Sequence, residues 1–320
     1  MNPSDALADL ATRLAAALPG RVARDAPSAP LVTYRCGGTL AVMVRVEREA
    51  DLSALAAALA PSPSVPFLVI GRGSNLLVAD AGFAGVAVML GEGFAELTID
   101  TDAVRVDAGG AVALPVLARR SGAAGVAGLE FYVGIPGSVG GAIRMNAGGH
   151  GAQTADVVTC ARVADCSTGE IRTLTRSEMG LGYRHSDLGR RELVLGASFS
   201  GTRDDPAACG RRIDEIVTWR REHQPGGQNA GSVFTNPPGD AAGRLIEAAG
   251  LKGLRVGGVV VSEKHANFFV AEPGARADDV ARLVQEVQQR VEAVSGVRLV
   301  PELALVGFDD GGGIDQEGEQ

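Results

Sequence analysis

The sequence predicts an α+β protein in two parts, with a boundary near residue 205. Between residues 65 and 200, short apolar runs are separated by glycine and polar turn residues, a pattern that favours strands. After Asp204, Asp205 and Pro206 the pattern changes to helices with short strands between them. A length of 320 residues is typical of a two-domain chain that buries a sizeable core.

The first part is expected to begin with two helices. In residues 1–18 leucines alternate with Asp5, Asp9 and Arg13, which predicts an amphipathic helix capped by Ser4. No basic segment precedes it, so a signal peptide is not expected. A second helix begins near Asp51. The other expected elements are a buried strand over 65–70, hairpins over 86–107, a helix over 112–121, and strands over 157–200 with a turn at 167–169.

The second part is expected to contain longer helices. Helices are predicted over 207–222 and 241–249, and strands over 256–261, 267–271 and 297–306. A long helix begins near Asp278, and its apolar stripe consists of Val280, Leu283, Val287, Val291 and Val294. The last residues, 309–320, are acidic and glycine-rich, so a disordered tail is expected.

Composition limits the classes of partner. The net charge of −8 argues against a nucleic-acid-binding protein, which needs a basic footprint, but not against phosphate ligands held by local amides and arginines. No apolar stretch approaches the roughly 18–20 residues of a membrane-spanning helix. The four cysteines show no CxxC spacing, so we expect no metal site and reduced thiols in a cytoplasmic protein.

Two glycine-rich segments are the strongest candidates for a ligand site. One follows the predicted strand over 65–70, and the other contains five glycines between residues 134 and 148, enough room for a pyrophosphate or a ring against backbone. The first alone can equally be an ordinary tight turn, but two such loops in the same half of the chain are more than turns usually require. Neither has the spacing of a Rossmann fingerprint or a P-loop. The candidate cofactor-binding residues are Gly71, Arg72, Gly73, Ser74, Asn75 and Leu76 in the first, and Gly134, Ile135, Pro136, Gly137, Ser138, Gly140, Gly141 and Ala142 in the second.

Several motifs, in order along the chain, resemble one enzyme family. GRGSNLL, GIPGSVGGA and NAGGHG look like the FAD-binding lobes of the UDP-N-acetylenolpyruvoylglucosamine reductase (MurB) family. The later segments YRHS, NAGSVFTNP, AGRLIEAAGLKG, SEKHANF and LVPELALVG resemble the same family, and the resemblance covers roughly residues 30 to 308. Spacing favours its compact form.

The resemblance implies a two-lobed FAD-binding domain of the p-cresol methylhydroxylase/vanillyl-alcohol oxidase type, followed by an α+β substrate domain. The expected division is a lead-in over 1–29, an FAD-binding domain over 30–204 with lobes of about 30–92 and 93–204, and a substrate domain over 205–308. The implied reaction of peptidoglycan precursor synthesis uses NADPH and non-covalent FAD to reduce the enolpyruvyl ether of a UDP-sugar. The family habit suggests a monomer.

The chemistry of an enol ether reduction suggests roles for two residues. Hydride addition leaves an enolate, which needs a cation on its carboxylate and an acid that protonates the neighbouring carbon. Arg184, in YRHS, suits the carboxylate because a guanidinium binds it bidentately. Glu302 can donate if its pKa rises beside the substrate carboxylate. Without the motif, these two residues are a surface arginine and an exposed strand glutamate.

The remaining site residues follow from the resemblance. It implies that Ser232 is the proton donor, although an isolated loop serine is usually only a solvated hydroxyl. Arg220 lies where it can approach a phosphate, although residues 220–224 are equally typical of a polar helix end. His223 stands where the family commonly has lysine, which puts nucleotide affinity there in doubt. The implied substrate contacts are Tyr183, Asn236, Lys252 and His265.

Two other functions remain as alternatives. One is an alcohol-oxidising flavoenzyme of the same fold, many of which tether FAD through a histidine in the first loop. No histidine precedes His150, so a tether in that loop is excluded. The other is an inactive nucleotide-sugar binder, against which the joint presence of Arg184, Ser232 and Glu302 argues.

Overall fold

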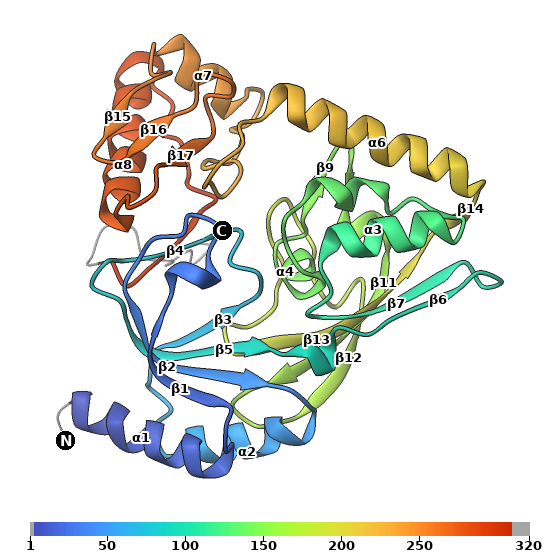
Figure 1. Ribbon diagram of the computed structural model, residues 1–320, viewed down its shortest axis with the longest axis vertical. Coiled ribbons are helices and arrows are strands. Elements are labelled where there is room, and N and C mark those ends of the chain that lie inside the picture. Colours follow the sequence, from blue (N-terminus) through green and yellow to red (C-terminus); the bar gives the residue numbers. More distant parts are fainter. Residues whose placement is uncertain (1–2, 309–320) are drawn as a thin grey trace. The chain divides into compact units, whose positions relative to one another are not determined.

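The computed structural model describes residues 3–308 and confirms the predicted α+β class (Figure 1). The expected tail over 309–320 lies outside the described residues. The chain divides into two compact units and passes between them several times, so the division does not follow a single boundary near residue 205. Unit 1 consists of Met1–Arg24, Val42–Arg72 and Gly85–Arg220, and unit 2 of Asp25–Ala41, Gly73–Ala84 and Arg221–Gln320.

The two helices predicted at the start of unit 1 are present and pack together through leucines. Helix α1 (Pro3–Ala17) has proline at its start, which is the helical position that proline tolerates best. Ser4 lies inside this helix, so the prediction that Ser4 caps it is wrong. Helix α2 (Ala50–Leu59) contacts α1, and the two share one hydrophobic cluster. The buried leucines of this cluster include Leu10, Leu14, Leu18, Leu52, Leu55 and Leu59.

A four-stranded sheet lies next to these helices in the order β1-β2-β5-β3 (Figure 1). Its strands are β1 (Val22–Pro27), β2 (Thr39–Val46), β3 (Phe67–Ile70) and β5 (Phe83–Leu90). Strand β3 is an edge strand, and only Ile70 is buried, so the expected fully buried strand is wrong. The prediction that the run from Val86 belongs to a hairpin is also wrong, because β5 pairs in parallel with β3.

Unit 1 also contains an antiparallel five-stranded sheet. Its order is β12-β11-β13-β7-β6, and β6 and β7 form a predicted hairpin. The turn predicted at 167–169 joins β11 to β12, with Gly169 N–H donating to Asp165 O at 2.7 Å. The strands are β6 (Leu97–Asp100), β7 (Arg105–Gly109), β11 (Val158–Asp165), β12 (Ile171–Thr175) and β13 (Glu192–Ser200).

Helices and short elements of unit 1 surround this sheet. Helix α3 packs against α6 at Gly122, where an added Cβ would lie 3.2 Å from both Cys209 Cβ and Ile213 Cδ1. The helices are α3 (Leu114–Ala123), α4 (Val139–Arg144), α5 (Thr154–Val157) and α6 (Pro206–His223), whose last residues belong to unit 2. The short elements are the 3₁₀ helices Glu92–Phe94 and Glu130–Gly134 and the strands β8 (Val126–Ala127), β9 (Gly148–Gly149), β10 (Ala152–Gln153) and β14 (Thr202–Arg203).

Unit 2 is built on a small antiparallel sheet with helices packed on it. The sheet has the order β15-β16-β17, and helices α7 and α8 share its hydrophobic cluster. Four of the five predicted stripe residues of α8 are buried, whereas Val294 is 67% exposed and lies outside the core. The elements are β15 (Arg255–Val256), β16 (Val259–Val261), β17 (Phe269–Ala271), α7 (Ala242–Ala248), α8 (Ala277–Ser295) and the 3₁₀ helix Ala29–Leu31.

Segments distant in the sequence meet within unit 2. Strand β4 (Leu76–Val78) pairs in parallel with β18 (Ala304–Val306), a strand shorter than the predicted 297–306. Next to β4, the Asp80 carboxylate accepts from the N–H groups of Ala277 and Asp278 at 3.2 and 3.1 Å. It therefore satisfies amides that the first turn of α8 leaves free.

Two further findings concern the environment of the chain. Over residues 3–308, no helix combines the length and the apolar character that crossing a membrane requires. The four cysteines are unpaired, and three of them are buried. Burial raises the pKa of the Cys36 thiol to about 11 and of the Cys166 thiol to about 12, so these thiols are unreactive at neutral pH.

Candidate active site

The second glycine-rich segment is held as a folded loop at the start of α4. Ser138 is 2% exposed and caps this helix, with the Gly141 N–H directed at its hydroxyl. Residues 110–114, the turn that leads from β7 into α3, hold the loop from one side, since Gly140 N–H donates to Gly110 O at 2.9 Å and Leu114 N–H to Gly137 O at 3.1 Å.

The first glycine-rich segment meets the second within unit 1. A Cβ added at Gly71, directly after β3, would lie 2.9 Å from the Ser138 hydroxyl oxygen. A Cβ at Gly140 would lie 3.3 Å from Gly110 O. Side chains at these positions would collide with the neighbouring loop, so the glycines let the two segments pack closely together. Closely packed glycine loops expose main-chain groups of the kind that hold an anion such as the diphosphate of FAD.

The rest of the first segment belongs to unit 2 and is held by protein contacts. The Gly73 carbonyl accepts from Thr33 N–H at 3.2 Å. The Asn75 side-chain amide donates to the Glu302 carbonyl at 2.9 Å, and Leu76 is buried in strand β4. Contacts of Ser74, Asn75 and Leu76 with a cofactor remain predictions.

Arg220 and His150 lie against the second glycine-rich loop. A Cβ at Gly134 would be 3.2 Å from Arg220 Cδ and 3.3 Å from His150 Nε2. Burial lowers the pKa of Arg220, and burial together with the nearby Arg220 charge lowers the pKa of His150. The His150 ring also packs edge-on against Trp219, with centroids 5.0 Å apart. A half-buried guanidinium beside a glycine loop fits the phosphate contact predicted for Arg220.

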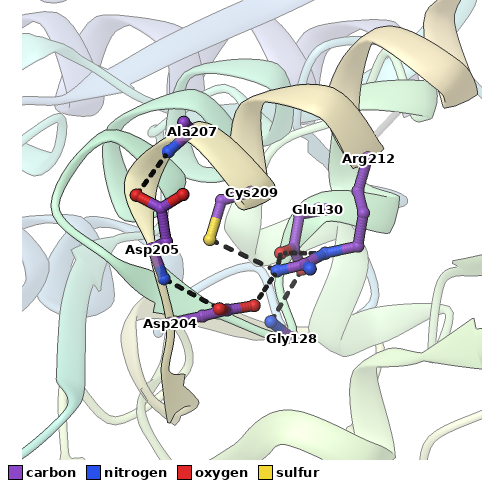
Figure 2. A network of polar contacts seen from close by, with 7 residues as sticks. All are labelled: Gly128, Glu130, Asp204, Asp205, Ala207, Cys209 and Arg212. Atoms are coloured by element: carbon purple, nitrogen blue, oxygen red, sulfur yellow. Dashed lines mark hydrogen bonds and ion pairs between the residues drawn. The ribbon is translucent and has the colours of Figure 1, made fainter.

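A polar network fixes the helix that carries Arg220 and Trp219. Figure 2 shows Arg212, near the start of α6, between Glu130 and Asp204 at 2.7 and 2.8 Å. Glu130 is 7% exposed and also accepts from Gly128 N–H at 2.7 Å, so its charge is compensated on both sides. The network joins α6 to the segment just before the second glycine-rich loop.

Arg184 lies on a strained segment beside the NAGGHG motif. Asn146, His150 and Arg184 have positive φ angles of 40°, 55° and 55°, which non-glycine residues rarely adopt. Asn146 is 1% exposed, and its Nδ2 donates to Gly182 O at 2.8 Å, so the two segments are adjacent. The Arg184 guanidinium lies 5.4 Å from the Tyr183 ring centroid. Strain of this kind accumulates at functional sites.

Unit 2 brings Ser232 and Glu302 onto adjacent segments. Glu302 N–H donates to Val233 O at 2.8 Å, and Thr235 N–H donates to Val300 O at 2.9 Å. Ser232 itself forms a bridge with Phe268 on the other side. Both side chains are partly exposed, as groups that act on a substrate must be. Their neighbouring placement is consistent with the roles predicted for them, whereas Arg184 belongs to unit 1.

The structure gives protein partners to three of the predicted substrate contacts. Asn236 Oδ1 accepts from Ala242 N–H at 3.0 Å and supports the start of α7. Lys252 pairs with Glu247 at 2.6 Å. Burial lowers the pKa of His265, and the Lys252 charge lowers it further. Tyr183, the fourth, is 59% exposed. Their contacts with substrate stay predictions.

Two residues of this region had no role assigned from the sequence. His150 and Asn267 stand in the motifs NAGGHG and SEKHANF, so membership of a motif was the available signal. His150 adjoins Arg220 and the second glycine-rich loop. Asn267 is 2% exposed and contacts the segment that carries Ser232. Over the described residues, no cluster of histidine, cysteine and carboxylate side chains has the arrangement of a metal site.

Comparison with known proteins first gives the class. Residues 40–175 match the family model "FAD binding domain", which contains both glycine-rich loops. Residues 223–306 match the model "UDP-N-acetylenolpyruvoylglucosamine reductase, C-terminal domain", which contains Ser232 and Glu302.

Relatives cover nearly the whole chain. The curated UDP-N-acetylenolpyruvoylglucosamine reductase of Methylorubrum extorquens is 42% identical over 91% of this chain and 94% of its own length. That of Parvibaculum lavamentivorans is 42% identical over 96% and 98%. The crystal structure of UDP-N-acetylenolpyruvylglucosamine reductase (MurB) from Thermus caldophilus is 34% identical, with a TM-score of 0.77 over 89% of this chain and 99% of that one. The chain belongs to the UDP-N-acetylenolpyruvoylglucosamine reductase family, which confirms the resemblance found in its motifs.

Proposed function

We propose that the protein reduces the enolpyruvyl ether of UDP-N-acetylenolpyruvoylglucosamine to UDP-N-acetylmuramate, with NADPH as the hydride donor. The step belongs to peptidoglycan precursor synthesis, and the protein acts as a cytoplasmic monomer. Family membership and the FAD binding domain over residues 40–175 support the reaction class. The observation that carries the proposal is the placement of Ser232 and Glu302 on hydrogen-bonded neighbouring segments, inside the region that matches the family's C-terminal domain.

The two glycine-rich loops would hold FAD without a covalent link. FAD held there would supply the transfer of hydride from NADPH to the methylene carbon of the substrate. Gly71 packs closely on the loop around Ser138, so the two glycine-rich segments meet there, and Arg220 provides a cation beside Gly134. These features suit the diphosphate and the ring of the cofactor.

Arg184 would bind the substrate carboxylate and stabilise the enolate. A guanidinium keeps its charge at every relevant pH and matches a carboxylate with two parallel donors. The positive φ of Arg184 supports this role, because a strained main chain at a fixed position preorganises the side chain before charge develops.

Ser232 would donate the proton that completes the reaction. The enolate carbon is a stronger base than a serine alkoxide. A serine hydroxyl can therefore protonate it when water is excluded. Glu302 would stabilise the enolate from the neighbouring segment as a donor or proton-sharing acid.

The test is single-turnover flavin reoxidation of Ser232→Ala in a stopped-flow instrument without oxygen. The variant should bind FAD, be bleached by NADPH and bind the substrate. Reoxidation on adding the enolpyruvyl substrate should be slower by roughly 10²–10⁴, the usual contribution of a general acid. Ser232→Cys, with a more acidic side chain of similar shape, should regain part of the rate. Reoxidation of Ser232→Ala at the wild-type rate would refute the assignment.

A further inference from the structure

Asn267 is a buried amide that makes two hydrogen bonds to a single residue. It is 2% exposed, in the segment that follows His265 in unit 2. Its Oδ1 accepts from Phe234 N–H at 3.0 Å, and its Nδ2 donates to Phe234 O at 2.8 Å. Because the bonds run in opposite directions, only a side chain with an acceptor and a donor side by side can make both.

The segment bound by Asn267 has little regular structure of its own. Residues 231–235 pass between 267–268 and 300–302 through isolated bridges and contain no strand. On one side, Val233 N–H donates to Asn267 O at 2.8 Å, and on the other Glu302 N–H donates to Val233 O at 2.8 Å. Gly231, just before Ser232, has φ +78° and nothing within 4 Å of an added Cβ, so its conformation is not enforced by packing.

The position of Ser232 therefore depends on what holds the peptides after it. Val233 and Phe234 are fully buried, and the Asn267 side chain satisfies both polar main-chain groups of Phe234. If the Phe234 peptide rotates, Ser232 moves with it, because only one residue separates them. A displacement of about 1 Å is enough to cost a reaction roughly a hundredfold in rate.

We propose that Asn267 is a positioning residue for proton transfer, which holds the Ser232 hydroxyl in register through the Phe234 peptide. The inference rests on the proposed function of Ser232 as the proton donor. Asn267 itself needs no contact with substrate or cofactor, since its amide is engaged by Phe234. The step that depends on it is substrate protonation, while flavin reduction by NADPH does not involve Ser232.

The test replaces the amide by an isosteric acid, Asn267→Asp. A protonated carboxyl can accept from Phe234 N–H and donate to Phe234 O, as the amide does, but an ionised carboxylate has no donor. Burial raises the pKa of such a carboxyl, so both forms should be reached between about pH 5 and pH 9. Flavin reoxidation by the enolpyruvyl substrate should approach the wild-type rate at low pH and fall about tenfold to a hundredfold as the carboxyl ionises.

Two comparisons make the result specific. Asn229→Asp is the matched control, because Asn229 lies in the same loop and its Oδ1 accepts from Gly231 N–H at 3.0 Å, a bond that a carboxylate keeps. The two bonds that the carboxylate loses run from Asn229 Nδ2 to the carbonyls of Gly226 and Gly227, at 3.4 and 3.2 Å, outside residues 231–235. Its reoxidation should follow the wild-type pH profile. Flavin reduction by NADPH should be unchanged in Asn267→Asp, whereas a general structural defect would slow both half-reactions.

Several outcomes would overturn the positioning role. They are a wild-type rate and pH profile for Asn267→Asp, or an equal slowing of both half-reactions. If Asn267→Asp does not fold, Asn267→Ser replaces it: reoxidation should slow while reduction by NADPH stays normal, and equal slowing would overturn the role. A wild-type rate for Ser232→Ala would instead remove the proposed function. Slow Ser232→Ala with wild-type Asn267→Asp would remove only the positioning role.

Discussion

A substitution at Gly73 distinguishes a requirement of the fold from a requirement of the cofactor. Gly73 has φ +60°, and a Cβ added there would lie 1.9 Å from the Leu31 carbonyl oxygen. That is far below any real Cβ contact, and the atom it meets is main chain, which cannot swing away. Gly73→Ala should therefore destabilise unit 2 whether or not a cofactor is bound.

Gly231 provides the matched control for this substitution. It has φ +78°, and an added Cβ meets nothing within 4 Å. Gly231→Ala should cost only the left-handed conformation of a residue with a Cβ, about 1–2 kcal/mol. Gly73→Ala should cost that amount plus the steric term of forced overpacking, about 1–3 kcal/mol.

The assay is a calorimetric measurement of the thermal unfolding of both variants, without added FAD. One kcal/mol corresponds to about 2–4 °C in proteins of 150–250 residues, so Gly73→Ala should unfold roughly 2–12 °C below Gly231→Ala. Equal midpoints would show that the contact with Leu31 does not constrain the fold. Wild-type stability of Gly73→Ala with loss of FAD alone would mean that the glycine serves the cofactor.

Two other predictions follow from the charges. Arg184→Ala should slow flavin reoxidation by the enolpyruvyl substrate by roughly 10²–10³, because one preorganised donor is lost. Reduction by NADPH should stay near normal. Stopped-flow traces with slow reduction by NADPH and normal reoxidation would refute this. The pKa of His265 is lowered by burial, so its contribution to stability is complete above the unfolded value of about 6.5 and is lost as the pH falls through the folded pKa. His265→Gln should accordingly flatten the pH dependence of the unfolding midpoint between about pH 5 and 7, and an unchanged slope would contradict this.

Local patterns in the sequence predicted most elements of the fold. The leucines of α2 and the apolar stripe of α8 are buried because a 3.6-residue period places them on one face. The pattern failed where pairing is non-local. Strand β5 looked like the start of a hairpin, but its partner is β3 in parallel, which requires a crossover connection that alternation alone does not reveal. Val294 continues the period of the stripe but lies beyond the end of the core.

Individual residues of the candidate site could be predicted only where they stand in a motif. The motifs indicated Ser232 and Glu302, and the structure places them on hydrogen-bonded segments. The contribution of Asn267 was not predictable in this way. It depends on the main chain of Phe234, 33 residues earlier, and a side-chain bond to a peptide group leaves no signal in residue type or spacing.

The asparagine of the first glycine-rich loop illustrates why a motif does not by itself reveal what each of its residues does. Its position after two glycines suggests a donor for a bound anion. In the structure its amide donates to the Glu302 carbonyl, and its own carbonyl accepts from Ala304 N–H at 3.1 Å. Strand β4 begins at the next residue and pairs with β18 two residues after Glu302. Asn75 therefore connects the loop that follows Gly71 to the segment that carries the acid. The Asn75 amide gives the Glu302 carbonyl a donor that the parallel ladder does not yet supply.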